Sequence, residues 1–265
     1  GLGPVLEFNA TRWEWWYDFN QEALLQLRER LPLRARAAGA TWEPVTDLDR
    51  STLVLPMLVA AARPKTPSSP GVRREFNSRD VRAAAVLALG RLRSSSAVPY
   101  IEIVLDAEPD LFVRTQAILA LGFSQSSQAV ETLQRLYLDG RESDEIRSYA
   151  AAGLGLIANA QAVDTLASQL TEKALRAQSN QLRAATVYAA GLSGETTLAD
   201  ALRALAKTWI FEREPSVRAL TAVALGGIGD PAAVPFLLDQ LDDPDNQVRR
   251  SAAAAMAGLP APLDE

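Results

Sequence analysis

One short pattern recurs along most of the chain and limits its possible folds more than any other feature. The pattern has the form V-R-x-x-A-A-x-A-L-G and returns about every 31 to 36 residues. A fixed period of this length is typical of proteins that grow by stacking equal units, each of which contacts only its neighbours. The copies start at Val81, Val113, Ile146, Leu182, Val217 and Val248.

Each copy is followed by a short polar turn and a second apolar stretch, such as 97–101 or 233–237. Ala and Leu at helical spacing favour helix in both stretches. A glycine suits the end of the first helix, and a proline near the start of the second suits a first turn. The unit is therefore predicted to be a pair of helices, with no strand-like segment in competition. The glycines that close the first five copies are Gly90, Gly122, Gly155, Gly191 and Gly226.

The units resemble HEAT repeats, and within them the short repeats first named from phycobilisome lyases. Residues 224–237 and 243–249 carry the resemblance most clearly, since they read ALGGIGDPAAVPFL and DPDNQVR. The resemblance extends over roughly residues 80 to 258. It implies an all-α fold, a right-handed α-α superhelix of the HEAT-type solenoid kind. It implies little about function, because such folds serve many binding roles.

The rest of the chain is predicted to form two further parts. Residues 1–50 are interpreted as an aromatic N-terminal cap or extension, residues 51–79 as a degenerate first repeat, and residues 80–265 as the HEAT-repeat solenoid. Leu53 to Leu58 reads as the second helix of the degenerate repeat. The Pro/Ser-rich stretch from Arg63 to Gly71 is predicted to be a loop. It is either an insertion in a terminal repeat or a flexible binding segment.

Most of the tryptophans lie near the start of the chain. This region is too aromatic for a disordered tail, and two interpretations stay open. The aromatic side chains either shield the apolar end of the first repeat or form a docking surface for a glycan or peptide. A cap is favoured, because solenoids need atypical ends to stay soluble. The four tryptophans are Trp13, Trp15, Trp16 and Trp42.

One arginine occupies the same position in every copy. These side chains could bind an anionic ligand, or they could bond acceptors in their own or the next unit. The second interpretation is preferred, because the chain has a net charge of -5 and acidic turns such as Glu108 and Glu214 precede several copies. This predicted structural ladder consists of Arg82, Arg114, Arg147, Arg183, Arg218 and Arg249.

The variable positions of the same helix are largely apolar. In the resembling family they face the concave side of the solenoid, and a long uncharged strip there would need a cover. We predict a partner-binding surface, although residues 13–31 of the chain could cover the strip instead, or its side chains could pack between units. The predicted surface comprises Leu87, Leu119, Tyr149, Tyr188, Leu220 and Val223.

Composition argues against catalysis and against several ligand classes. The chain has no histidine and no cysteine, which removes the commonest general base and the usual zinc ligands. The run Asp242 to Asn246 lacks the spacing of a calcium-binding EF-hand and reads as an acidic turn. The negative net charge argues against nucleic acid. We predict no enzyme activity, no cofactor, no metal and no membrane insertion.

The predicted function is a non-catalytic scaffold that binds a protein or peptide partner on the concave face. The alternative, implied by the resemblance, is an accessory role in attaching a chromophore or cofactor to another protein, as bilin lyases do. A glycan- or nucleic-acid-binding solenoid ranks lower. The chain begins with Gly1, so a bacterial cytoplasmic location and export after removal of an upstream signal are both open.

Overall fold

The computed structural model describes residues 46–63, 78–205, 208 and 213–259. Every regular element in these residues is helical, so the prediction of an all-α fold is confirmed. The chain divides into two units after Asp49. The first is described only over its last four residues, which include α3 (Asp47–Asp49). The predicted aromatic segment and most of the proline-rich loop lie outside the described residues.

The second unit begins with a helix that contains a proline. A π-helical turn, η1 (Arg50–Val54), leads into α4 (Leu55–Ala62). Pro56 has no N–H to donate, and its ring collides with the carbonyl group four residues earlier in a regular α-helix. A wider π turn before the proline removes that conflict. One side of α4 packs against α5, where Leu58, Val59 and Ala62 contact the core.

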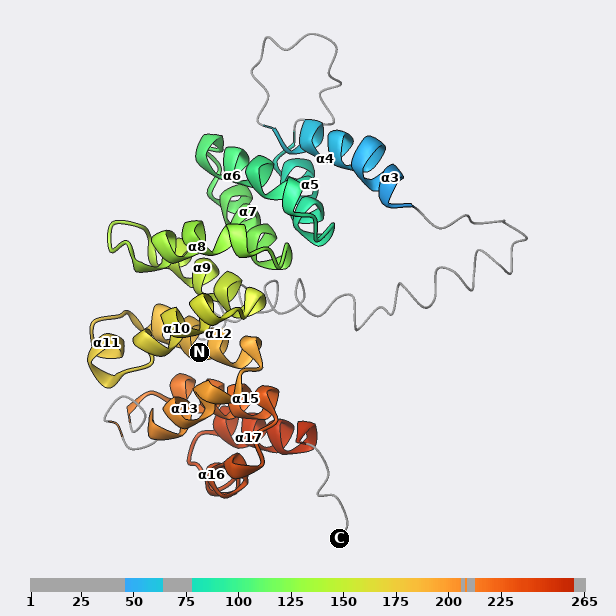
Figure 1. Ribbon diagram of the computed structural model, residues 1–265. Helices are drawn as coiled ribbons and strands as arrows, with labels where there is room; N and C mark the ends of the chain where they lie inside the picture. Colours follow the sequence, from blue (N-terminus) through green and yellow to red (C-terminus); the bar gives the residue numbers. More distant parts are fainter. Residues whose placement is uncertain (1–45, 64–77, 206–207, 209–212, 260–265) are drawn as a thin grey trace. The chain divides into compact units, whose positions relative to one another are not determined.

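A row of six long helices forms one layer of this unit, and each helix contacts the next in sequence order (Figure 1). We call it the inner row. Most of its helices start at a Ser or Asp whose side chain accepts a backbone N–H, as Ser143 does from Ile146. The inner row consists of α5 (Arg79–Arg91), α7 (Leu111–Phe123), α9 (Asp144–Ile157), α12 (Asn180–Ser193), α15 (Pro215–Ile228) and α17 (Asn246–Gly258).

A second row of shorter helices packs against the first, and we call it the outer row. A 3-10 turn precedes most of its helices: η3 (Ser95–Ala97), η4 (Ser127–Ala129), η5 (Thr196–Leu198) and η6 (Pro231–Ala233). One unit carries an additional short helix, α11 (Glu172–Arg176), which accounts for the longest spacing between glycines. The outer row consists of α6 (Val98–Ala107), α8 (Val130–Leu138), α10 (Ala160–Gln169), α13 (Ala199–Leu205) and α16 (Val234–Gln240).

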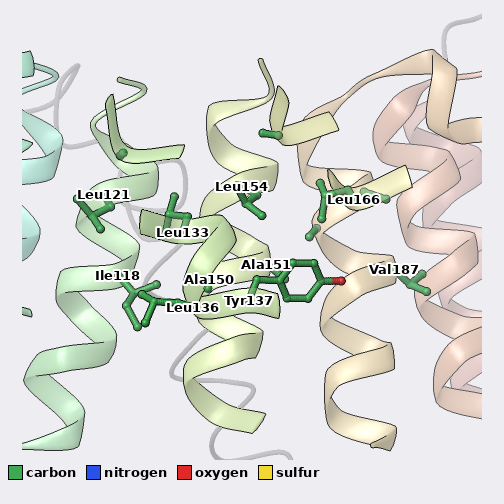
Figure 2. Packing of buried hydrophobic residues seen from close by; sticks show 14 of the residues in the cluster. Ile118, Leu121, Leu133, Leu136, Tyr137, Ala150, Ala151, Leu154, Leu166 and Val187 are labelled. Atoms are coloured by element: carbon green, nitrogen blue, oxygen red, sulfur yellow. The ribbon is translucent and has the colours of Figure 1, made fainter. Parts of the chain in front are cut away.

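The core runs continuously between the two rows. Ile118 and Leu121 of α7, Leu133 and Leu136 of α8, and Leu154 of α9 interdigitate in the part shown in Figure 2, and all are at most 2% exposed. Each unit contributes side chains to the packed layer that it shares with the next unit, so no unit has a closed core of its own. The fold is therefore stabilised mainly at the junctions between units.

The repeated glycines bring neighbouring inner helices into backbone contact. A Cβ atom added at Gly122 would lie 2.7 Å from Cα of Gly153, closer than real Cβ atoms approach a backbone atom. The other four glycines make the same kind of contact with the following inner helix. The pairs are Gly90 with Ala120, Gly155 with Ala189, Gly191 with Ala224, and Gly226 with Ala255.

Candidate binding surface

The predicted partner-binding residues lie on five of the inner helices, from α5 to α15, and Tyr149 and Leu220 also pack against the core. Helical spacing places Leu87, Tyr188 and Val223 at one equivalent position of their units, and Tyr149 and Leu220 at another. Val223 is 39% exposed, and the other four are partly buried. Five of the six predicted residues therefore keep some exposed surface.

Leu119 is the exception, and its prediction needs correcting. It is only 1% exposed, because every residue of α7 from Thr115 to Gly122 is buried. The middle turns of α7 thus leave no side open, and Leu119 belongs to the packed interior. Leu87 on α5 is consequently separated from the other four residues by a helix whose middle turns are fully buried.

The remaining four residues lie on three consecutive helices, and we call them the α9–α15 strip: Tyr149, Tyr188, Leu220 and Val223. The positions between them are small and buried, among them Ala152 at 0% and Ala219 at 1% exposure. None of the four strip residues carries a charge. Burial raises the pKa of Tyr188 to about 12, so its phenol stays neutral at physiological pH. The strip is therefore an apolar surface bearing two aromatic rings.

The arginine ladder lies at the junctions between units. Arg82 donates from Nε and Nη2 to the carboxylate of Glu108, at 2.8 and 3.0 Å. Arg218 contacts Asp243 in the same two-pronged way, at 2.6 and 3.0 Å. In both cases the acid precedes the next inner helix, so the ion pair connects one unit to the following one. Arg114 with Glu142, and Arg183 with Glu214, repeat this forward contact.

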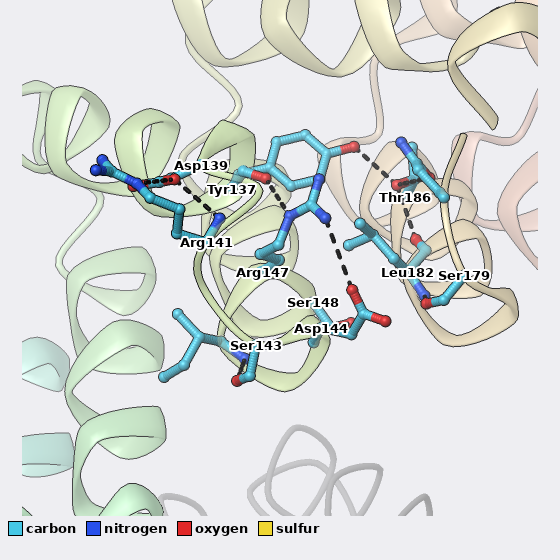
Figure 3. A network of polar contacts seen from close by, with 12 residues as sticks. Tyr137, Asp139, Arg141, Ser143, Asp144, Arg147, Ser148, Ser179, Leu182 and Thr186 are labelled. Atoms are coloured by element: carbon cyan, nitrogen blue, oxygen red, sulfur yellow. Dashed lines mark hydrogen bonds and ion pairs between the residues drawn. The ribbon is translucent and has the colours of Figure 1, made fainter. Parts of the chain in front are cut away.

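The other two ladder arginines do not reach the next unit and instead contact residues around the start of their own helix. Arg147 donates to the carbonyl oxygen of Tyr137 at 3.0 Å and pairs with Asp144 at 3.6 Å (Figure 3). Arg249 donates to the carbonyl oxygens of Asp243 and Pro244. All six ladder arginines therefore contact a carboxylate or a carbonyl group of the chain. We propose on these contacts that the ladder stabilises the array and does not bind a ligand.

A buried network of uncharged side chains, not predicted from sequence, joins α8 to α12. It lies at the junction where Arg147 forms no ion pair with the next unit. The hydroxyl groups of Tyr137 on α8 and Thr186 on α12 lie 2.7 Å apart (Figure 3). Thr186 also lies 3.2 Å from Oε1 of Gln178. The sequence carries one signal for this network. Thr186 stands where most copies of the pattern have Ala, and Thr221 holds the same position in the next copy. Burial raises the pKa of Tyr137 to about 12.

The Arg218–Asp243 pair is expected to make stability depend on pH. Burial alone raises the pKa of the Asp243 carboxyl, but hydrogen bonds from Arg218 and from the N–H of Asp245 outweigh it, so the pKa lies below its ordinary 3.8. The stabilisation is then complete above about pH 4 and is lost as the pH falls further. Melting temperatures of the parent and Asp243→Asn between pH 7 and 3 should converge in acid. Curves that stay parallel down to pH 3 would contradict this.

A family model for HEAT repeats matches residues 74–144 and 168–257, more than half of the chain. The chain belongs to the HEAT-repeat family. Its two rows of helices are the paired helices of successive HEAT units. Comparison with curated proteins gave no match.

Two solved structures show similarity to this chain. The complex of CpcE and CpcF of phycocyanin lyase from Nostoc sp. PCC7120 is 20% identical, with a TM-score of 0.51, over 82% of this chain and 80% of that chain. Human deoxyhypusine hydroxylase in complex with glycerol is 19% identical, with a TM-score of 0.40, over 79% of this chain and 98% of that chain. The first similarity supports the HEAT fold and the predicted resemblance to lyase-type repeats.

In the part of the chain that the structure describes, no group of three or more Asp or Glu side chains is arranged to hold a metal ion. None of the helices in the described ranges is both long enough and apolar enough to cross a bilayer. Within the acidic run 242–246, Asp243 accepts from Arg218, and Asp245 accepts from the first backbone N–H groups of α17. Both carboxylates therefore act in stacking and capping.

Proposed function

We propose that this HEAT protein is a non-catalytic scaffold that binds a segment of another protein on the α9–α15 strip. The observation that carries the proposal is the apolar character of Tyr149, Tyr188, Leu220 and Val223 on three consecutive helices. Val223 is exposed, and the other three side chains keep part of their surface open. Large apolar side chains that remain open on one face of a protein mark contact sites for a partner. Every ladder arginine contacts the chain itself, which leaves the strip as the best candidate.

A protein segment fits this strip better than a nucleic acid does. Nucleic-acid binding draws most of its affinity from cations that contact phosphates. The strip has no cation, and the chain carries a net charge of -5. An apolar surface with aromatic rings instead matches the centre of a protein interface, which is depleted in charge and enriched in Tyr.

The partner is expected to present a helix or an extended peptide. Parallel helices leave shallow grooves between their side chains. An amphipathic helix can place an apolar residue into such a groove at every third or fourth position. Tyr149 and Tyr188 should dominate the affinity, because interface hot spots are enriched in tyrosine. Leu220 and Val223 then extend the contact onto α15.

The test is the double variant Tyr149→Glu with Tyr188→Glu. Two charges on the strip should weaken partner binding by roughly 30-fold or more, while the melting temperature stays within about 4 °C of the parent value. Partners would be identified by proximity cross-linking in the native host and measured as purified proteins. Tyr100→Glu is the matched control, because Tyr100 is 37% exposed on the outer helix α6.

Three outcomes would contradict the proposal. A large fall in melting temperature would mean that the tyrosines pack within the chain, or that residues 13–31 cover the strip, as the rival interpretation of the sequence holds. Normal melting with every native partner retained would mean that the strip is not the binding surface. Loss of binding in Tyr100→Glu as well would show an effect of charge and not of position.

A second candidate function follows from the similarity to the phycocyanin lyase complex. In this alternative the protein assists the attachment of a chromophore to its partner. It predicts that a bilin incubated with the chain and its partner gains a protein-bound visible absorbance band that survives denaturation. The scaffold function alone predicts binding of the partner without such a band.

A further inference from the structure

Two charged side chains of opposite sign lie beside the α9–α15 strip, one at each end of it. Glu145 is four positions before Tyr149 on α9, so both side chains lie on the same side of that helix. Arg250 is four positions before Ala254 on α17, and Ala254 is the equivalent of Val223 in the next unit. Glu145 keeps part of its surface open, and Arg250 is exposed. A segment that lies along the strip therefore meets a carboxylate at one end and a guanidinium group at the other.

The two helices between these charges place no charge of their own beside the strip. One turn before the strip positions, α12 carries Gln181 and Ala184, and α15 carries Ser216 and Ala219. The ladder arginine of each of these helices pairs with the acid that precedes the next inner helix. From α9 to α17, the charges beside the strip are thus confined to its two ends.

The fold of the described residues uses the neighbour of each charge and not the charge itself. On α9 the ion pair with Arg147 is made by Asp144, and Glu145 forms none with a described residue. On α17 the adjacent Arg249 donates to two backbone carbonyl groups, whereas Arg250 makes no such contact within the described ranges. Internal pairing therefore does not account for either charge.

We infer that the partner segment carries a cation at the end that lies over α9 and a carboxylate at the end that lies over α17. The inference rests on the proposed function, because it concerns the partner of the same strip. Ion pairs at an exposed rim add little affinity. They select one orientation, because the reversed segment would bring like charges together at both ends. The strip thus supplies most of the affinity, and Glu145 and Arg250 determine the direction of the segment.

The separation of the two charges limits the length of the segment. Helix α17 is three steps from α9 along the inner row. Packed helices are about 8–10 Å apart, so the two charges are separated by about 24–30 Å. An α-helix rises about 1.5 Å per residue, so a helical segment needs about 16–20 residues between its charged ends.

The experiment uses a synthetic amphipathic helix of about 20 residues, with Leu on one side, Lys at one end, Glu at the other and a fluorophore beside the Lys. Fluorescence anisotropy measures its affinity. Glu145→Lys and Arg250→Glu should each weaken binding about 5-fold, because either orientation then contains one contact between like charges. The double reversal should restore the parent affinity, because the peptide then binds turned end for end.

Energy transfer reports the orientation directly. The chain has no cysteine, so Gln247→Cys allows a single acceptor dye to be attached to α17, where Gln247 is exposed. With the parent charges the Lys end of the peptide lies over α9, and transfer to this dye should be weak. In the double reversal the Lys end lies over α17, and transfer should increase.

The double reversal of Glu131→Lys with Arg135→Glu is the matched control. Both residues are exposed on the outer helix α8, and the variant keeps the net charge of the parent. Its affinity for the peptide and its energy transfer should equal those of the parent. Circular dichroism should show the same helix content in all variants.

The inference is overturned if the single reversals bind the peptide as tightly as the parent. Energy transfer that does not change in the double reversal overturns it as well. In either case, loss of peptide binding in Tyr149→Glu with Tyr188→Glu would still support the strip as the binding surface. A peptide that does not bind the parent contradicts both this inference and the proposed function.

Discussion

Replacing Gly155 with Ala is expected to lower the free energy of unfolding by about 3 kcal/mol, at the upper end of the usual cost of overpacking. The added Cβ would overlap the carbonyl oxygen of Ala189 and lie 3.1 Å from its Cα. Both are backbone atoms, so α9 and α12 must move apart to admit one methyl group. The better helix propensity of Ala offsets only about 1 kcal/mol of this cost. Urea denaturation measures the change.

Gly140→Ala is the matched control for this substitution. Nothing lies within 4 Å of a Cβ at that position, and Gly140 is exposed in the turn after α8. Its stability should stay within about 0.5 kcal/mol of the parent. If Gly155→Ala unfolded at the same urea concentration as Gly140→Ala, close backbone packing at the junction would not be required for stability.

Replacing Arg218 with Ala is expected to cost about 3 kcal/mol. Arg218 is 8% exposed, and the side chain of its partner Asp243 is 7% exposed. Removing the arginine leaves a carboxylate buried without its cation, which is more costly than losing a pair at the surface. Arg147→Ala should cost less, about 1 kcal/mol, because it mainly loses a hydrogen bond to a carbonyl group.

Arg141→Ala serves as the control for the charge itself. Arg141 pairs with Asp139 at 2.9 Å, but its side chain is 91% exposed, so its loss should leave the melting temperature unchanged. The variants should also be compared at high salt, which screens exposed pairs more than buried ones. If Arg218→Ala melted like the parent, while the protein lost affinity for an anionic ligand, the ladder would be a binding site and not a structural one.

The fold could be predicted from the sequence because its main contacts recur at a fixed spacing. The pattern located the inner helices, and its glycines are the points where those helices touch. Irregular features were not predicted. The added helix α11 occurs in one unit only, and the π turn before Pro56 depends on how a single proline is accommodated. Periodicity carries no information about features that appear once.

The candidate surface was harder to predict, because helical spacing gives a direction and not an exposure. Leu119 and Val223 occupy equivalent positions in their units, yet one is 1% and the other 39% exposed. The difference depends on what surrounds α7 and α15, which sequence spacing does not report. The same limit applies to the ladder, since Arg147 and Arg218 look alike in sequence but reach towards different units.

The glycine contacts also determine how the array can deform. Inner helices in backbone contact cannot approach each other further, so the inner row resists compression. Outer helices are linked by side chains, such as the amides of Gln134 and Gln161, and these links can lengthen. Bending is therefore absorbed in the outer row. A ligand lying across the inner row meets side chains at a constant spacing of about 8–10 Å. Its own contact groups must therefore repeat at the same spacing.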